Sequence, residues 1–449
     1  MYLKRKIDQY LIEWKSDPEH LPLIVKGARQ VGKTESIMNF ATKNYENIVY
    51  INFALEKKYK TILDSGYDVE SIINNITLID TRKSFIPENT IIIFDEIQEY
   101  PDIATTLKSF KIDGKYDVVC SGSMLGINYN QIHSNSVGYK TDYEMYSMDF
   151  EEFLWAKGYD SKRVDSIFNN MIEMKPFSST EMEVYNNLFL SYCVLGGMPA
   201  VVRNYIDKGN YSGSIEIQKQ IMMDYEEDVR KYAIGLEQTK IMKVYRSIPL
   251  QLAKENKKFQ YNKVDKNARA REYLGCIDWL KDAGTINVCY SMNFPELPIK
   301  GNLDESKFKI YYPDTGLLIS CLDDETQEDL RANKNLGVYK GALYENFAAE
   351  SFVKQGIALC YYSKENSQLE EDFLVRTTNE LLPVEVKSNK KSSISLKTLV
   401  ESERYKDIQH GIKFSQNNIG YVNNIYTFPY FCLFLLKKFL KEGIIENMK

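Results

Sequence analysis

The chain has 449 residues, a length that predicts two to four domains rather than one. Hydrophobic residues make up 44% and charged residues 27%, the balance of a soluble globular protein whose domains can each bury a core. The formal net charge of −5 excludes a uniformly basic nucleic-acid coat, so any nucleic-acid contact would need a local basic patch.

Cysteine usage and hydropathy exclude several further classes. The seven cysteines include no Cys-x-x-Cys pair and only three histidines are present, which argues against a zinc site and against a disulfide framework. We therefore expect a reducing, cytoplasmic compartment. The longest apolar run, 428–436, is far shorter than the ~20 residues that a membrane span needs. It predicts a buried C-terminal helix instead, and no membrane partner.

Short apolar runs alternate with helical stretches over the first 125 residues. They occur at 23–25, 48–53, 91–94 and 117–120. Continuous apolar runs are typical of strands buried on both faces, and their alternation with helices predicts an α/β domain with a parallel sheet.

A glycine-rich loop follows the first of these runs and opens a helix expected over 34–43. It matches G-x-x-x-x-G-K-[ST] at every position. Glycines let the backbone wrap phosphates, and the helix N-terminus adds its positive dipole end. Lys33 is expected to reach the β- and γ-phosphates of ATP, and Thr34 to ligate Mg²⁺. The predicted nucleotide-binding residues are Gly27, Ala28, Arg29, Gln30, Val31, Gly32, Lys33 and Thr34.

The ends of two later strands complete the predicted site. Asp95 is expected to hold Mg²⁺ through water, and Glu96 to orient and polarise the attacking water. The alternative is an ordinary strand end with solvated acids. Ser121 and Ser123 close the next strand, where either hydroxyl could sense the γ-phosphate; a simple Ser-Gly turn is the alternative.

These motifs resemble the AAA+ ATPases of bacteria and archaea that carry a C-terminal domain of unknown function. The segments 148–154 and 196–199 extend the resemblance past the loop, the Phe-Asp-Glu-Ile-Gln strand end and the Ser-Gly-Ser turn. The resemblance implies an AAA+ core followed by a small helical lid. It does not single out an arginine finger among Arg29, Arg82, Arg203 and Arg230, each of which also suits a surface ion pair.

The middle of the chain resembles a winged helix-turn-helix. Helices are expected at 240–256, 261–267 and 269–283, and the two strands of a wing at 285–290 and 307–312. Between residues 254 and 271, seven basic residues against two acidic ones give a local charge of +5, which favours a DNA contact. A protein-interaction module with a solvated basic face is the alternative. The residues are Lys254, Lys257, Lys258, Lys263, Lys266, Arg269 and Arg271, with Glu255 and Asp265 opposed.

The C-terminal part resembles the PD-(D/E)xK nucleases. Glu385 and Lys387 lie two apart on an expected strand and so share a face. Asp372 opens the preceding strand, expected to pair antiparallel, and Glu345 lies on the expected helix 341–354. The resemblance implies a Mg²⁺ pocket with a lysine that stabilises charge. A fold that has lost its catalysis is the alternative.

The sequence thus predicts four parts: an AAA+ core (1–145), a helical lid (146–235), a winged-helix-like unit (236–322) and an α/β restriction-endonuclease-like domain (323–449). Two functions are open. One is an ATPase that uses ATP and Mg²⁺ and acts on, or is regulated by, DNA. The other is an ATP-dependent switch that gates a protein partner, with an inactive nuclease-like domain. The oligomeric state does not follow from the sequence.

Overall fold

The structure of the chain is a computed structural model that describes most of the 449 residues. Glu255 and Asp323, which the sequence analysis used, lie outside the described residues. The chain forms two compact units, one of residues 2–147 with 282–284 and one of 148–281 with 285–449, and each is described by itself. Within the described part, no helix has both the length and the apolar character that crossing a bilayer requires. The described ranges are 1–123, 136–233, 236–254, 257–322, 324–331, 338–387 and 393–442.

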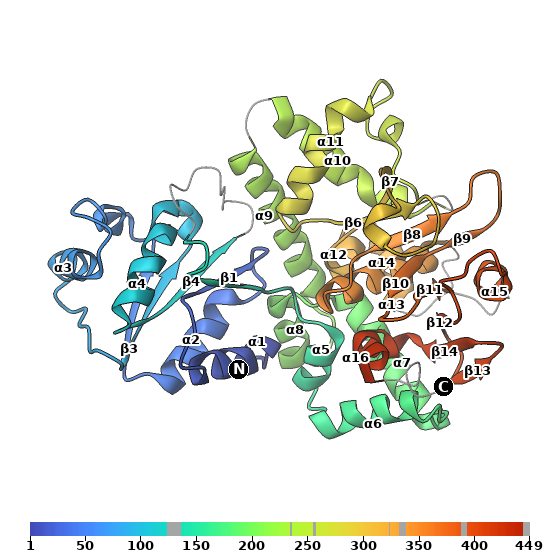
Figure 1. The fold of residues 1–449 in the computed structure, drawn as a ribbon, viewed down its shortest axis with the longest axis horizontal. Helices are drawn as coiled ribbons and strands as arrows, with labels where there is room; N and C mark the ends of the chain where they lie inside the picture. The colour runs from blue at the N-terminus through green and yellow to red at the C-terminus, as the bar shows by residue number, and fades with distance from the viewer. Residues whose placement is uncertain are drawn as a thin grey trace. The chain divides into compact units, whose positions relative to one another are not determined.

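A five-stranded parallel sheet forms the centre of the first unit (Figure 1). Its strand order is β2-β3-β4-β1-β5, and every neighbouring pair is parallel. The four apolar runs predicted as strands are confirmed. The fifth strand has the sequence Thr-Asp-Tyr-Glu, without an apolar run, because it lies at the edge of the sheet and is only half-buried. The bounds are β1 (Leu23–Gly27), β2 (Asn47–Asn52), β3 (Thr90–Asp95), β4 (Asp117–Ser123) and β5 (Thr141–Glu144).

Helices cover both faces of this sheet. On one face, α1 (Lys6–Ser16) and α2 (Lys33–Asn44) pack on the odd-numbered side chains of β1 and β3. On the other, α3 (Val69–Ile79) and α4 (Leu107–Asp113) pack on the even-numbered ones. Burial on both faces explains why β3 reads as one apolar run. Three short 3₁₀ turns complete the unit: η1 (Lys57–Thr61), η2 (Ile97–Glu99) and η3 (Pro101–Thr106).

The second unit begins with helices. Side-chain caps start several of them: Asp149, Asp160 and Ser178 each accept a hydrogen bond from a backbone N–H of the first turn. The helices are α5 (Phe150–Ala156), α6 (Ser161–Ile172), α7 (Ser179–Leu195), α8 (Pro199–Lys208), α9 (Ser214–Tyr232), α10 (Leu236–Leu252) and α11 (Ala270–Asp282).

The region predicted to be a winged helix differs from that pattern in its second helix. The second expected helix is only a 3₁₀ turn, η6 (Tyr261–Lys263). Asp265 then accepts a hydrogen bond from the backbone N–H of Asn267 at 3.3 Å, a local turn that competes with helix. The two expected wing strands, β6 (Asn287–Met292) and β7 (Leu303–Tyr311), do pair antiparallel.

These two strands are half of a larger sheet. β6 also pairs in parallel with β8 (Cys360–Ser363), which pairs with β9 (Glu370–Glu371). The sheet order is therefore β7-β6-β8-β9, with strands from both sides of residue 323.

A second five-stranded sheet, of order β10-β11-β12-β14-β13, forms the remainder of this unit. β10 and β11 are antiparallel neighbours, as the sequence predicts. The expected helix at 428–436 is confirmed in part: Phe428 and Pro429 end β14, and the buried residues after the proline form a 3₁₀ helix that runs into the C-terminal α-helix. The remaining elements are β10 (Phe373–Arg376), β11 (Leu381–Val386), β12 (Gly411–Ser415), β13 (Gly420–Val422), β14 (Ile425–Pro429), η7 (Ile299–Gly301), η8 (Tyr430–Leu435), α12 (Thr315–Ser320), α13 (Asp324–Arg331), α14 (Val338–Lys354), α15 (Ile394–Glu401) and α16 (Leu436–Glu442).

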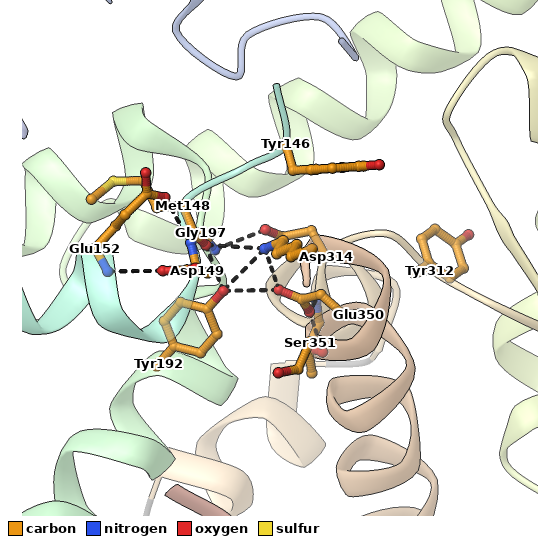
Figure 2. A network of polar contacts seen from close by, with 12 residues as sticks. Tyr146, Met148, Asp149, Glu152, Tyr192, Gly197, Tyr312, Asp314, Glu350 and Ser351 are labelled. Carbon is orange, nitrogen blue, oxygen red and sulfur yellow. Dashed lines mark hydrogen bonds and ion pairs between the residues drawn. The ribbon is translucent and has the colours of Figure 1, made fainter. Parts of the chain in front are cut away.

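A buried polar network anchors the C-terminal end of α14 (Figure 2). The Tyr192 hydroxyl oxygen lies 2.6 Å from the Met148 carbonyl oxygen and 2.8 Å from a Glu350 carboxylate oxygen, within hydrogen-bond distance of both. Lys354 donates to the same carboxylate at 2.6 Å, and Thr315 donates to it through both N–H and hydroxyl at 2.7 Å. Burial raises the pKa of Glu350 despite Lys354. The network therefore fixes α14 against α7 and the start of α12.

Candidate functional site

The loop between β1 and α2 has the backbone of a phosphate-binding cradle. Gln30 and Gly32 both have left-handed conformations, with φ of 64° and 96°. Such residues turn successive N–H groups toward one side, which forms a concavity for an anion. At Gly32 the positive φ favours glycine. α2 starts directly after it, and because its N-cap residue is Gly32, no side-chain cap hydrogen bond covers its first N–H groups.

Two features hold this loop in place. A Cβ on Gly27 would overlap the carbonyl oxygen of Met145, so only glycine fits where β1 ends. The buried Arg5 guanidinium donates to the carbonyl of Val31 at 2.6 Å and to that of Tyr146 at 2.7 Å. Arg5 was not identified from the sequence, because it lies far from the loop along the chain.

The predicted phosphate-binding lysine lies inside the loop. The Lys33 ammonium donates to the carbonyl oxygens of Gly27 at 3.1 Å and Ala28 at 2.8 Å, and the residue is only 8% exposed. The cation is therefore positioned at the mouth of the cradle by the first turn of α2 and by the loop itself.

Asp95, at the end of β3, is the centre of a hydrogen-bond cluster. The Thr34 hydroxyl lies 3.1 and 3.3 Å from its two oxygens. Tyr50 donates to it at 2.6 Å and Asn52 at 3.1 Å, and the Ser121 hydroxyl donates to its other oxygen. Burial, together with the bond to Asp95, raises the pKa of Tyr50. Asn52 and Asp95 are register partners at the ends of adjacent parallel strands, which is why they meet.

Glu96 leaves the strand in a different direction. Its backbone is left-handed, with φ of 56°, and starts the turn η2. The Gln98 side-chain amide donates to the Glu96 carboxylate and accepts from the backbone N–H of Ser123 at 3.2 Å. Of the two predicted sensor serines, Ser121 thus uses its hydroxyl on Asp95, whereas Ser123 meets Gln98 through its backbone.

These donors suit a magnesium–nucleotide complex. A hydroxyl and a carboxylate about one hydrogen bond apart, Thr34 and Asp95, are the oxygen ligands that Mg²⁺ prefers, directly or through water. The lysine and the N–H groups of the loop suit phosphate. Two of the four arginine-finger candidates form ion pairs: Arg82 with Asp80 at 2.9 Å and Arg230 with Glu226 at 3.8 Å.

A second charged cluster surrounds Glu345 on α14. Its carboxylate accepts from Lys309 at 3.2 Å, from the Tyr311 hydroxyl at 2.5 Å and from Lys257. Burial alone would raise the pKa of Glu345, but Lys257 and Lys309 lower it to about 2. Lys309 is 1% exposed and also pairs with Glu370 at 3.0 Å.

The other predicted nuclease-like residues lie nearby. Lys387 pairs with Glu385 at 2.7 Å, so the two share a face as the strand period predicts. Asp372 accepts from the backbone N–H of Val386 at 2.9 Å, and burial and the charge of Glu345 raise its pKa to about 6. Glu371, which no sequence motif singled out, is fully buried with both oxygens outside any hydrogen bond among the described residues. Burial, then Glu385, raises its pKa well above the usual range.

The cluster does not have the form of a metal site. Over the part of the chain that the structure describes, no three His, Cys, Asp or Glu side chains are grouped so that they could hold a metal ion. The Mg²⁺ pocket of Glu345, Asp372 and Glu385 therefore stays a prediction.

The basic segment 254–271 is divided in its contacts. Lys257 is bound to Glu345, and Lys258 donates to the Ser363 hydroxyl at 2.8 Å. Asp265 pairs with Lys243 at 2.8 Å. Four cations at and before the start of α11 are exposed instead, namely Lys263, Lys266, Arg269 and Arg271.

Solved structures and a curated relative are only remotely similar. The Aeropyrum pernix ORC1 protein in complex with DNA is 11% identical and covers 73% of this chain and 91% of its own (TM-score 0.29). The Thermotoga maritima RuvB branch migration motor is 12% identical and covers 63% and 89% (TM-score 0.30). TM-scores this low do not establish a shared overall fold. An uncharacterised protein of Haemophilus influenzae is 25% identical over 184 residues, which span 39% of this chain and 43% of that relative.

Family models divide the chain into three. Residues 186–328 match a domain of unknown function (DUF8612), and residues 340–432 match another (DUF4143). Residues 19–154 match the model of the AAA domain, which takes in the loop, Asp95 and Glu96. The N-terminal unit of this chain therefore carries an AAA domain.

Proposed function

We propose that the N-terminal unit binds ATP with Mg²⁺ and hydrolyses it. The observation that carries the proposal is the meeting of loop and strand ends, where Lys33 lies in the cradle and Thr34 contacts Asp95. Lys33 would bind the β- and γ-phosphates, while Thr34 and Asp95 would hold the metal. Bound Mg²⁺ would neutralise phosphate charge as the γ-phosphoryl group leaves.

Glu96 is the proposed residue that orients water. It follows Asp95 directly, has a left-handed backbone, and its carboxylate accepts from Gln98 rather than from the donors that bind Asp95. A carboxylate so placed can accept a proton from an attacking water while its neighbour keeps the metal. The backbone turn after β3 thus allows adjacent acids to have different roles, with Asp95 holding the metal and Glu96 orienting water.

We expect Glu96→Gln to keep ATP binding and to lose turnover. The amide preserves size but cannot accept the proton, so kcat should fall about 100-fold or more, the usual contribution of a general base. Phosphate release and titration with a fluorescent ATP analogue measure the two quantities. Glu99→Gln is the matched control, since Glu99 lies in the same turn but pairs with Lys60 at 3.5 Å. Wild-type hydrolysis by the Glu96→Gln variant would remove Glu96 from this role.

We also propose that DNA contacts the exposed cations of 263–271. This proposal is supported by the exposure and the charge of these residues, because four exposed cations lie close together in sequence in a chain whose net charge is −5. Phosphate contacts of this kind bind without reading sequence. The proposal adds to the ATPase a ligand that can regulate it.

Weak, salt-sensitive DNA binding is the expected result. With about four phosphate contacts, affinity should fall roughly 100-fold between 50 and 200 mM salt. Replacing Lys263, Lys266, Arg269 and Arg271 by alanine should remove it in fluorescence anisotropy. A control variant with the same loss of charge replaces the exposed Lys162, Lys208, Lys300 and Lys406. If DNA affinity fell equally in both variants, the effect would be one of net charge alone. If the first variant kept its DNA affinity, residues 263–271 would not be the contact.

A second candidate function is a nucleotide-gated switch that acts on a protein partner and has an inactive nuclease-like domain. One observation favours it: Lys257 and Lys309 of this chain already neutralise Glu345, the helix carboxylate of the nuclease-like set. An ATPase rate that is indifferent to DNA supports the switch, whereas strong stimulation by DNA supports the first function.

A further inference from the structure

We infer that Gln98 is a positioning residue, which holds the Glu96 carboxylate and links it to the end of β4. The inference rests on the proposed ATP hydrolysis and adds to it a residue that touches neither nucleotide nor water. Gln98 lies in the turn η2, which folds the chain back after Glu96. Its side-chain amide contacts Glu96 on one side and Ser123 on the other.

The chemistry of the three groups fixes the orientation of this amide. The backbone N–H of Ser123 can only donate, so it must meet the amide oxygen, at 3.2 Å. The amide nitrogen then faces the Glu96 carboxylate, which accepts. A glutamine side chain, with one donor and one acceptor end, is suited to join a backbone N–H to a carboxylate.

The cluster around Asp95 meets Glu96 through its backbone, whose N–H donates to the Asp95 carboxylate at 3.1 Å. Tyr50 and Asn52, at the end of β2, both donate to Asp95. Among the side-chain hydrogen bonds of the described residues, the bond from Gln98 is the one that Glu96 receives. Among the described residues, Gln98 is therefore the side chain that holds the Glu96 carboxylate.

The link to β4 gives this contact a second consequence. Ser121 and Ser123 lie at the strand end expected beside the γ-phosphate, and Ser123 contributes the N–H that Gln98 accepts. A shift of that strand end on contact with phosphate would move the amide, and with it the carboxylate. Water orientation by Glu96 is thereby tied to the state of β4.

The test compares Gln98→Ala with Gln98→Glu. Alanine removes both contacts. In Gln98→Glu, the side chain has the length of glutamine, and its carboxylate can still accept from the Ser123 N–H. That carboxylate repels Glu96, whereas the glutamine amide donates to it. We expect each change to lower kcat about tenfold or more, as misplacement of a catalytic group does. KM for ATP and the affinity for ADP should stay within about twofold, since neither change touches the loop.

A control variant and a stability measurement distinguish the possible outcomes. Gln9→Ala, an exposed glutamine on α1, controls for loss of an amide. Thermal melting of each variant identifies a change that merely unfolds the unit, and Gln98→Glu, being isosteric, keeps the test open if alanine does so. Wild-type protein that hydrolyses ATP while both Gln98 variants retain its kcat overturns this inference alone. Wild-type protein without hydrolysis overturns the proposed function together with it. A fall in nucleotide affinity equal to the fall in kcat would also overturn a positioning role.

Discussion

Replacing Lys33 by alanine is expected to weaken ATP binding about 100-fold or more. The ammonium lies at the mouth of the loop, with the carbonyls of Gly27 and Ala28 as its present partners. When a phosphate group binds, the ammonium would donate to charged phosphate oxygens instead of these neutral carbonyls. Hydrogen bonds between charged groups are the stronger kind. The alanine variant keeps the N–H groups of the cradle but lacks the cation that is proposed to bind the β- and γ-phosphates. Titration with a fluorescent ATP analogue measures the loss.

The matched control for this change is Lys26→Ala. Lys26 lies on β1, one residue before the loop, is partly exposed, and pairs with Asp142 at 2.8 Å. Its removal takes away an equal charge at a similar place, so affinity for ATP should change little. Equal affinities in Lys33→Ala and the wild type would contradict the assignment of the loop.

Replacing Lys309 by methionine is expected to lower the free energy of unfolding by about 3–5 kcal/mol, the usual effect of breaking a buried ion pair. Lys309 is fully buried between Glu345 and Glu370. Burial alone would lower its pKa, but the two carboxylates, Glu345 above all, hold it well above the usual value, so the ammonium stays charged. Methionine keeps the volume and leaves Glu345 with one lysine fewer. Chemical unfolding followed by tryptophan fluorescence measures the change.

Lys307→Met provides the control on the same strand. Lys307 lies two residues earlier with 47% of its side chain exposed, and it pairs with the partly exposed Asp304 and the exposed Glu365. We expect about 0.5 kcal/mol or less. Similar unfolding midpoints for the two variants would show that Lys309 is not needed to neutralise the cluster. Stabilisation of the wild type by MnCl₂ would instead favour a metal-binding, nuclease-like site.

The sequence was most informative where chemistry and periodicity coincide. The four apolar runs of the AAA domain are strands because both faces of that sheet are covered, and continuous burial shows directly as continuous hydrophobicity. Elements with less burial were harder to predict. β5 is half-polar at an edge, and the run 428–436 is buried throughout, so its hydrophobicity could not distinguish a strand and 3₁₀ turn from a helix.

The site shows a similar limit. Thr34 and Asp95 were each predicted from a motif, and in the structure their side chains lie 3.1 Å apart. The partners Tyr50, Asn52 and Arg5 belong to no motif. Asn52 could have been found from register, since a polar residue ending the strand beside β3 must face Asp95. Arg5 and Gln98 depend on how loops fold back, which strand and helix periods do not encode.

The sheet β7-β6-β8-β9 has a consequence for how such chains can change over generations. β6 belongs to the segment that matches one family model and β8 to the segment that matches another, yet the two are hydrogen-bonded neighbours. Recombination that removed one segment alone would leave β6 or β8 without its neighbour and expose an unpaired strand edge, which favours aggregation. The two segments are thus expected to be inherited as a pair, and mutations in one to be compensated in the other.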